Sequence, residues 1–374
     1  MRIRGAVLER IGAAGPFAES RPLSVSELEL ADPGHGEILV RVEAAGVCHS
    51  DLSVVDGNRP RPVPMLLGHE AAGRIEQMGP GVSGLEVGRR VVMTFLPRCG
   101  KCAGCASGGV RPCTEGSRTN EAGTLLGGDR RLTRDGEPVH HHLGVSGFAT
   151  HVVVDACSVV PVDDDVPADV AAVLGCAVLT GGGAVLNAGK PGPEETVAIV
   201  GLGGVGMAAL LTARADVGLT VWGVDTAADK LATAERLGAD RVVTPAEVAE
   251  EGLLADVVVE CAGNAKAFET AVAMTAPGGR TVTVGLPPAS AQAAVSPLWL
   301  VAGGRTVIGS YLGSSVPTRD IPSFAGMYLR GQLPVDELIT SRIPLEQINE
   351  GMDRLADGTA IRQIIDFTEQ RWEA

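Results

Sequence analysis

TVAIVGLGGVGMAALLTARA, residues 196–215, decides the fold, because an apolar strand runs directly into a glycine-rich turn and a helix-like stretch. Gly201, Gly203 and Gly206 form the pattern G-x-G-x-x-G. The first glycine allows a tight turn, the second lets the backbone approach a pyrophosphate, and the third lets helix and strand pack closely. Free N–H groups and the helix dipole favour an anion at this helix N-terminus. The segment predicts a dinucleotide-binding turn that also includes Gly204 and Val205, against the alternative of a purely structural turn.

The next apolar strand, TVWGVD, ends in Asp225, 19 residues after Gly206. A carboxylate near this spacing binds the ribose hydroxyls of NAD and would repel the 2′-phosphate of NADP. Lys230 could reach the same ribose. The pattern therefore favours NAD, with a solvated acid at a strand end as the alternative.

Further apolar segments, RVVTP, DVVVECAG and RTVTVG, alternate with helix-like stretches, which indicates βαβ units and a parallel sheet. Residues 35–160 instead contain short strands broken by Gly and Pro, and the chain becomes mixed again after about residue 312. We predict an α/β protein with a β-rich domain at 1–177, a doubly wound parallel-sheet domain at 178–312, and a return to the first domain at 313–374.

The composition limits the class of protein. The chain has 374 residues, of which 45% are hydrophobic and 20% charged, as expected for a globular protein of two domains. A formal net charge of -14 argues against nucleic acid and anionic membrane surfaces as partners. The N-terminus does not resemble a signal peptide, and we expect no apolar run long enough to span a membrane. We therefore expect a cytoplasmic protein whose eight cysteines are thiols or metal ligands.

Four cysteines, Cys99, Cys102, Cys105 and Cys113, follow the spacing C-x2-C-x2-C-x7-C. In a reducing compartment, four thiolates this close suit a closed tetrahedral zinc site that stabilises a loop. An iron–sulfur cluster is the main alternative, but ferredoxin runs place Pro after the last Cys, where this chain has Thr114. We predict structural zinc here, with no open position for catalysis.

A second set, Cys48, His69 and Cys176, is dispersed along the chain. Each residue alone is more often a structural one. Together they would supply two thiolates and an imidazole, leaving the open coordination position that catalytic zinc sites need. The spacing does not join them.

A resemblance does. GVCHSDL, LGHEAAGRIEQMGPGVSGLEVGRRV, the four-cysteine run, IVGLGGVG and PLEQINEGMDRLADGTAIRQII are similar to segments of the zinc-dependent medium-chain alcohol dehydrogenases. The resemblance extends over nearly the whole chain, and HHHLGVSGFATHVVV points to the liver-type and formaldehyde-dehydrogenase-like branch. It implies a GroES-like catalytic domain, a Rossmann domain, two zinc ions per chain, and a homodimer or homotetramer. It also implies hydride transfer between NAD and an alcohol, aldehyde or ketone, with zinc stabilising the alkoxide.

The resemblance also implies roles for single residues. Cys48, His69 and Cys176 would bind the catalytic zinc, with Glu70 behind the metal. Asp51 would accept a hydrogen bond from His69. Ser50 would relay the alcohol proton to the cofactor ribose, and His49 would lie near the pyrophosphate. The remaining positions are Thr180, Gly285 and Leu286 for the nicotinamide, Arg362 for a cofactor phosphate, and Phe95, His142, Leu143 and Leu286 for the substrate pocket.

Three departures from the family pattern limit which of these roles carry over to this chain. Ser53 stands where the proton relay usually ends in His, and His49 stands where Arg is frequent, so His49 or water would be the terminal base. His142 replaces a frequent aromatic residue, and Arg89 replaces Asp in GDRV. The alternatives left open are a thiol-adduct formaldehyde dehydrogenase, with Arg59 and Arg118 as nearby cations, a polyol or aryl-alcohol dehydrogenase, and a non-catalytic NAD-binding protein with structural zinc only.

Overall fold

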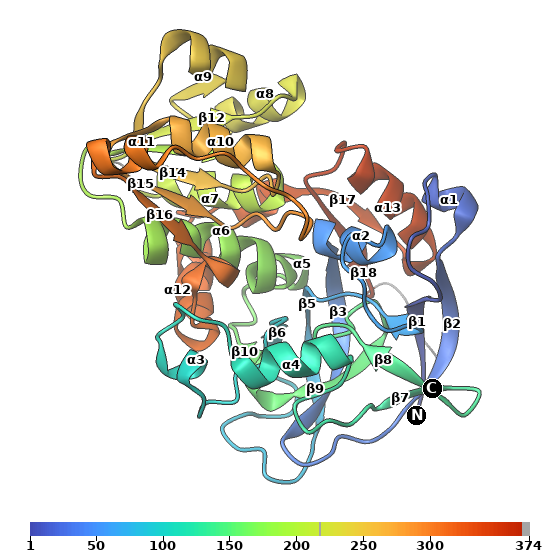
Figure 1. Ribbon diagram of the computed structural model, residues 1–374. Helices are drawn as coiled ribbons and strands as arrows, with labels where there is room; N and C mark the ends of the chain where they lie inside the picture. The colour runs from blue at the N-terminus through green and yellow to red at the C-terminus, as the bar shows by residue number, and fades with distance from the viewer. Residues whose placement is uncertain (217, 369–374) are drawn as a thin grey trace. The chain divides into compact units, whose positions relative to one another are not determined.

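The computed structural model describes residues 1–216 and 218–368, and the chain forms two compact units (Figure 1). Unit 1 comprises Met1–Cys176, Pro317–Leu329 and the C-terminal segment from Val335. Unit 2 comprises Ala177–Val316 and Arg330–Pro334. The domain boundaries set from the sequence, after residues 177 and 312, remain a prediction beside this division.

Unit 2 is built on one parallel sheet of six strands, in the order β13-β12-β11-β14-β15-β16. Numbered along the chain this is 3-2-1-4-5-6, the order of the Rossmann fold. The strands are β11 (Thr196–Val200), β12 (Thr220–Val224), β13 (Arg241–Val243), β14 (Ala255–Glu260), β15 (Thr275–Thr283) and β16 (Thr306–Gly309). Central strands of such a sheet are covered on both faces, which explains why TVAIV and ADVVVE are almost continuously apolar.

Helices cover both faces of this sheet, with α10 and α11 on one side and α6 and α7 on the other (Figure 1). The helices of unit 2 are α6 (Leu179–Gly183), α7 (Gly204–Arg214), α8 (Ala228–Arg236), α9 (Pro245–Glu251), α10 (Ala265–Ala273) and α11 (Pro297–Gly303). A 3₁₀ turn, Tyr311–Ser314, follows β16. The doubly wound parallel sheet expected from the alternating pattern is therefore present.

Unit 1 is rich in β-structure, as expected. Its two sheets are a closed barrel in the order β1-β2-β7-β8-β4 and a seven-stranded sheet. The barrel strands are β1 (Arg2–Leu8), β2 (Leu23–Leu30), β4 (Met65–Leu66), β7 (Leu132–Arg134) and β8 (Glu137–His141). The second sheet contains β3 (Glu37–Val47), β5 (Ala71–Met78), β6 (Arg90–Met93), β9 (His151–Asp155), β10 (Val159–Pro161), β17 (Ile339–Ile343) and β18 (Arg362–Asp366). Pairing of β18 with β3 brings the C-terminal segment back to this sheet.

Seven α-helices lie in the described part of unit 1. They are α1 (Phe17–Ser20), α2 (His49–Val55), α3 (Ala103–Ala106), α4 (Thr114–Ala122), α5 (Ala168–Val173), α12 (Pro317–Leu329) and α13 (Ile348–Ala356). Short 3₁₀ turns at Ala156–Ser158, Val335–Leu338 and Leu345–Gln347 connect strands and helices. One apolar core joins the barrel, the second sheet and α13.

A continuous helical run, Ala168–Gly189, has 22 residues and is long and apolar enough to cross a membrane by those two criteria alone. The expectation that no apolar run reaches this length was wrong, because residues 170–189 contain no charged side chain. In the structure 89% of its most apolar window is buried, as in the core helix of a globular protein. Two segments of it, Leu174–Val178 and Ala184–Gly189, are wound as π-helix.

Candidate active site

The N-terminus of α2 places two of the predicted site residues. Cys48 is the residue before the helix, and Asp51 lies in its first turn, where the carboxylate Oδ2 accepts the backbone N–H of Cys48 at 3.1 Å. A carboxylate that caps a helix in this way fixes the first turn. His49 is exposed and Ser50 half-buried, so this short turn presents both side chains beside buried Cys48.

Asp51 also orients His69. Its Oδ1 accepts a hydrogen bond from His69 Nδ1 at 2.9 Å, and both side chains are buried. Because Nδ1 is held by the carboxylate, Nε2 is the ring nitrogen that remains for a metal. His69 Nε2 in turn lies 3.5 Å from Cys176 Sγ. The structure therefore contains the hydrogen bond between Asp51 and His69 that the family resemblance implies.

Cys176 lies on the π-helical turn Leu174–Val178. Such turns are local departures from α-geometry that recur at functional sites. Cys48, His69, Glu70 and Cys176 each offer a ligand atom, and these atoms all lie within 4.8 Å of one another, entirely inside unit 1. Two soft thiolates and an imidazole form the donor set that zinc prefers.

Glu70 gives the strongest indication that the cluster binds a metal ion. Both of its carboxylate oxygens are buried and have no hydrogen-bond donor in the described part of the chain. Burial raises the pKa of Glu70 to about 7, against the attraction of Arg362. The guanidinium of Arg362 pairs with Oε2 at 3.4 Å without making a hydrogen bond, which leaves Oε1 for a bound cation, so the residues fit a metal ion.

Arg362, on β18, was predicted to reach a cofactor phosphate. In the structure its guanidinium is buried, with Nη1 at 3.4 Å from Glu70 Oε2 and 3.3 Å from the carbonyl oxygen of Val47, to which it donates. Sequence reasoning missed this ion pair, since the two residues are 292 positions apart and only the pairing of β18 with β3 brings them together. A cofactor contact of Arg362 remains a prediction.

The predicted pocket residues of unit 1 lie around His69. The ring of Phe95 meets His69 edge to face, with centroids 5.5 Å apart, and the ring of His142 does so at 5.6 Å. His142 Nδ1 lies 3.3 Å from Asp51 Oδ1, so this nitrogen faces the carboxylate behind His69. Leu143 follows it with a left-handed backbone, and Leu286 belongs to unit 2. That these residues contact substrate remains a prediction.

The four-cysteine run forms a second group. Cys99 Sγ lies 4.0 Å from Cys105 Sγ, and Cys102 Sγ lies 3.9 Å from Cys113 Sγ, with all four sulfurs within 4.8 Å of one another. Backbone N–H groups of Cys99, Cys105 and Gly116 donate to these sulfurs at 3.3–3.4 Å, as they do to thiolates. The backbone N–H of Cys105 contributes most to lowering the pKa of Cys102 to about 5.

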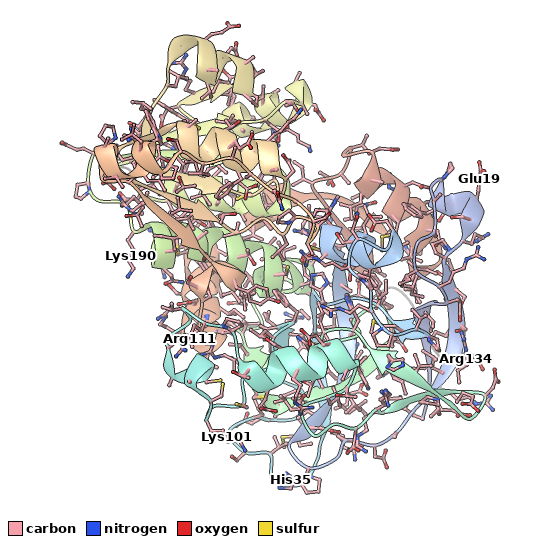
Figure 2. The ribbon with its side chains drawn as sticks, in the orientation of Figure 1. Glu19, His35, Lys101, Arg111, Arg134 and Lys190 are labelled. Atoms are coloured by element: carbon pink, nitrogen blue, oxygen red, sulfur yellow. The ribbon has the colours of Figure 1, made fainter. Side chains whose placement is uncertain are left out.

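Short helices α3 and α4 place these sulfurs by using Cys102 and Cys113 as their N-terminal caps. Lys101 and Arg111 project from the exposed side of this segment (Figure 2). All eight cysteines of the chain are free thiols, as expected, and no disulfide competes for the cluster. Four sulfurs converging on one point suit a tetrahedral ion.

Unit 2 contains most of the predicted cofactor residues, whereas Arg362 belongs to unit 1. Gly201 has φ +91°, which only glycine adopts readily, and a Cβ there would lie 2.7 Å from Ala262. A Cβ on Gly206 would meet the carbonyl oxygen of Gly201. A Cβ on Gly203 would meet nothing within 4 Å. The protein itself thus needs glycine at 201 and 206, whereas the open space at 203 suits a ligand that approaches the backbone, as a pyrophosphate does.

Asp225 follows β12 and reaches back to the glycine turn. Its Oδ2 accepts the N–H of Leu202 at 2.7 Å and its Oδ1 accepts the N–H of Ala227 at 3.0 Å. Lys230 lies on the first turns of α8. Each carboxylate oxygen keeps a further lone pair, so the arrangement fits a ribose diol. Thr180 is on α6, and Gly285 and Leu286 follow β15.

Comparisons with known proteins agree with this geometry. The family model described as "Alcohol dehydrogenase GroES-like domain" matches residues 34–164, and that described as "Zinc-binding dehydrogenase" matches residues 204–327. A Drosophila melanogaster protein, alcohol dehydrogenase class-3, is 33% identical over 368 residues, which cover 95% of this chain and 97% of that protein.

The chain belongs to the zinc-dependent medium-chain alcohol dehydrogenases.

Two solved structures of the same family extend the likeness to the backbone. A zinc-binding domain alcohol dehydrogenase protein from Burkholderia ambifaria has a TM-score of 0.90 and 32% identity, over 98% of this chain and 99% of that one. Benzyl alcohol dehydrogenase from Acinetobacter calcoaceticus has a TM-score of 0.88 and 31% identity, over the same shares of the two chains. As an alcohol dehydrogenase of this family the chain is an oxidoreductase that uses zinc and a nicotinamide cofactor.

Proposed function

We propose that this alcohol dehydrogenase uses NAD and two zinc ions per chain, and that Cys48, His69 and Cys176 hold the catalytic one. The observation that carries the proposal is the convergence of these three buried side chains with Glu70 within 4.8 Å. Four sulfurs at Cys99, Cys102, Cys105 and Cys113 form the second site. The alternative, a non-catalytic protein with structural zinc only, does not explain why the side chains of the first cluster converge.

Zinc at the first cluster supplies a Lewis acid that lowers the pKa of a bound alcohol, and NAD supplies the hydride acceptor. The chain's own residues position these groups. Asp51 holds His69 through Nδ1, which leaves Nε2 as the nitrogen that would bind the zinc. Ser50, next to the cluster on α2, accepts the alcohol proton at Oγ and passes it outward. Exposed His49 is the base at the solvent end of this path.

NAD preference rests on Asp225. Its carboxylate is fixed against the glycine turn by the N–H of Leu202. A fixed anion at the end of the second strand accepts hydrogen bonds from two ribose hydroxyls and repels a 2′-phosphate. Lys230 and the backbone after β15 complete the proposed cofactor contacts.

Self-association is supported by one surface of unit 2. Strand β16 is the edge of the parallel sheet, and the side chain of Val307 on it is exposed. Neighbouring α11 contributes Leu298, 75% exposed, and Val301, 80% exposed. A flat apolar edge strand with unpaired backbone groups pairs readily with a second copy. We propose a homodimer or homotetramer that uses this edge, and a cytoplasmic location, in keeping with eight unpaired thiols.

The test of function is the appearance of NADH with a panel of alcohols. The panel contains short primary and secondary alcohols, benzyl-type alcohols, polyols, and formaldehyde with and without glutathione. We expect zinc-dependent turnover with primary or aryl alcohols and NAD. Turnover of formaldehyde only with glutathione would assign the thiol-adduct reaction instead. Absence of turnover with every alcohol in a zinc-replete enzyme would overturn the proposal.

A further inference from the structure

Glu260, the last residue of β14, is a carboxylate in a place where burial is costly. The strand reads ADVVVE, and Glu260 is 1% exposed. None of the Lys, Arg or His side chains in the described residues forms an ion pair with it. A buried carboxylate without a cation is destabilising unless donors compensate it, and an apolar residue would fill the strand end at lower cost. A specific task for this carboxylate explains its presence.

Two donors meet on Glu260, one from the loop after β14 and one from the last residue of β15. The backbone N–H of Gly263 donates to Oε1 at 2.7 Å, and the hydroxyl of Thr283 donates to Oε2 at 2.7 Å. Gly263 belongs to the loop after β14, and Thr283 ends β15, which leads directly to Gly285 and Leu286. One side chain therefore joins the loops after two adjacent parallel strands.

The two loops also pack backbone against backbone. A Cβ on Gly263, whose φ is +68°, would lie 2.9 Å from the backbone nitrogen of Leu286. A Cβ on Gly285 would overlap the backbone of Gly263 and lie 2.9 Å from Glu260 Oε1. The carbonyl oxygen of Glu260 accepts the N–H groups of Val284 and Gly285 at 3.0 and 3.3 Å. The backbone at residues 284–286 is thus held by the carbonyl oxygen of residue 260, and the Glu260 carboxylate adds its hydrogen bonds to Gly263 and Thr283.

The same loop touches the glycine turn. A Cβ on Gly201 would lie 2.7 Å from Ala262, and the N–H of Cys261 donates to the carbonyl oxygen of Val200 at 2.8 Å. In open α/β sheets, ligands bind outside the carboxyl ends of the strands, where these loops lie. Glu260 sits beneath this edge, in contact with its loops.

We propose that Glu260 is a positioning residue for the nicotinamide half of the cofactor. It sets the backbone of residues 284–286 through Gly263 and Thr283, and this inference rests on the proposed NAD site at Gly285 and Leu286. Loss of the carboxylate leaves two donors unsatisfied and frees the loop. We expect little effect on the adenosine half, which we propose to bind at Asp225 and the glycine turn, because the contacts of that turn with Cys261 and Ala262 do not involve the Glu260 carboxylate.

Calorimetric titration of the zinc-replete enzyme with NADH and with ADP-ribose, which lacks the nicotinamide, separates the two halves. We expect Glu260→Met to weaken NADH about tenfold or more while ADP-ribose affinity changes less than about twofold. Glu260→Gln keeps an oxygen for Gly263 and can donate to Thr283, so we expect it to restore NADH affinity. Thr283→Val, which removes one donor only, should cause a smaller loss in the same direction.

Thr281→Val is the matched control. Thr281 lies two residues earlier on β15, and its hydroxyl shares a buried hydrogen bond of 2.6 Å with Thr275. Loss of this bond should lower the melting temperature but leave the ratio of the affinities for NADH and ADP-ribose unchanged. Equal weakening of NADH and ADP-ribose by Glu260→Met, or no weakening of either, would overturn the inference. A wild-type enzyme that binds NADH no better than ADP-ribose would overturn the proposed nicotinamide site as well.

Discussion

At the scale of single residues, the candidate site depends on side chains that make two hydrogen bonds to two different neighbours. Asp51 is the clearest case, since one oxygen holds His69 through Nδ1 and the other caps the helix that begins after Cys48. The carboxylate thereby positions both the imidazole of His69 and the backbone of Cys48. Such supporting hydrogen bonds determine how well a metal site is preorganised.

Cys48→Ser should reduce the metal content from two zinc ions per chain to one. Turnover should fall about a thousandfold or more, because Lewis-acid stabilisation is worth several kcal/mol. NADH binding should be unchanged, because Cys48 is not among the residues that we propose to contact the cofactor. Metal analysis and titration with NADH measure both effects. Cys157→Ser, at an exposed cysteine outside both clusters, is the control and should behave as wild type. Full activity in Cys48→Ser would remove the catalytic-zinc assignment.

Asp225→Gly should lower the preference for NAD over NADP by about tenfold to a hundredfold, the worth of one to two lost hydrogen bonds to a charged group. The variant also releases the N–H of Leu202, which loosens the glycine turn for both cofactors. The ratio of kcat/KM for NAD and NADP cancels that common effect. An unchanged ratio would show that Asp225 does not read the ribose.

At the scale of elements, strand pairing creates electrostatic costs that no local pattern shows. Pairing of β9 with β3 sets Asp155 opposite Glu37. Burial, and secondarily the charge of Glu37, raises the pKa of Asp155 to about 6, against the hydrogen bond it accepts from the N–H of Leu126. An unfolded Asp ionises near pH 4. The folded chain therefore binds the extra proton between about pH 4 and pH 6.

Because the folded state binds more protons in this window, Asp155 makes stability fall as pH rises from about 4 to 6. Asp155→Asn removes this cost and should stabilise the fold at pH 8 by up to about 3 kcal/mol, with no gain below about pH 4. Denaturant unfolding at several pH values measures it. Glu86→Gln, at an exposed carboxylate, is the control and should leave the pH dependence unchanged. A gain at pH 8 that persists below pH 4 would contradict the assignment.

At the scale of the whole molecule, the proposed homodimer or homotetramer depends on the edge of the parallel sheet. Val301→Lys combined with Leu298→Asp places charges on the most exposed part of α11. A charged edge opposes pairing between copies, so we expect a smaller assembly by size-exclusion chromatography with light scattering. Val110→Lys, at a side chain of unit 1 that is 70% exposed, is the control for adding a surface charge. An assembly size unaffected by the double variant would place the interface elsewhere.

The sequence by itself determined the glycine turn, Asp225 and the four-cysteine group, because each lies within a short stretch whose local geometry follows from residue type and spacing. The fold class followed too, since the alternation of apolar strands and helices has its own period. Other features needed the tertiary structure. Arg362 meets Glu70 only through strand pairing, and Cys176 meets His69 across 107 residues. Glu260 looks like any strand-end acid until two loops are seen to converge on it. Contacts between distant segments depend on how the chain folds back, and spacing along the sequence carries no record of that.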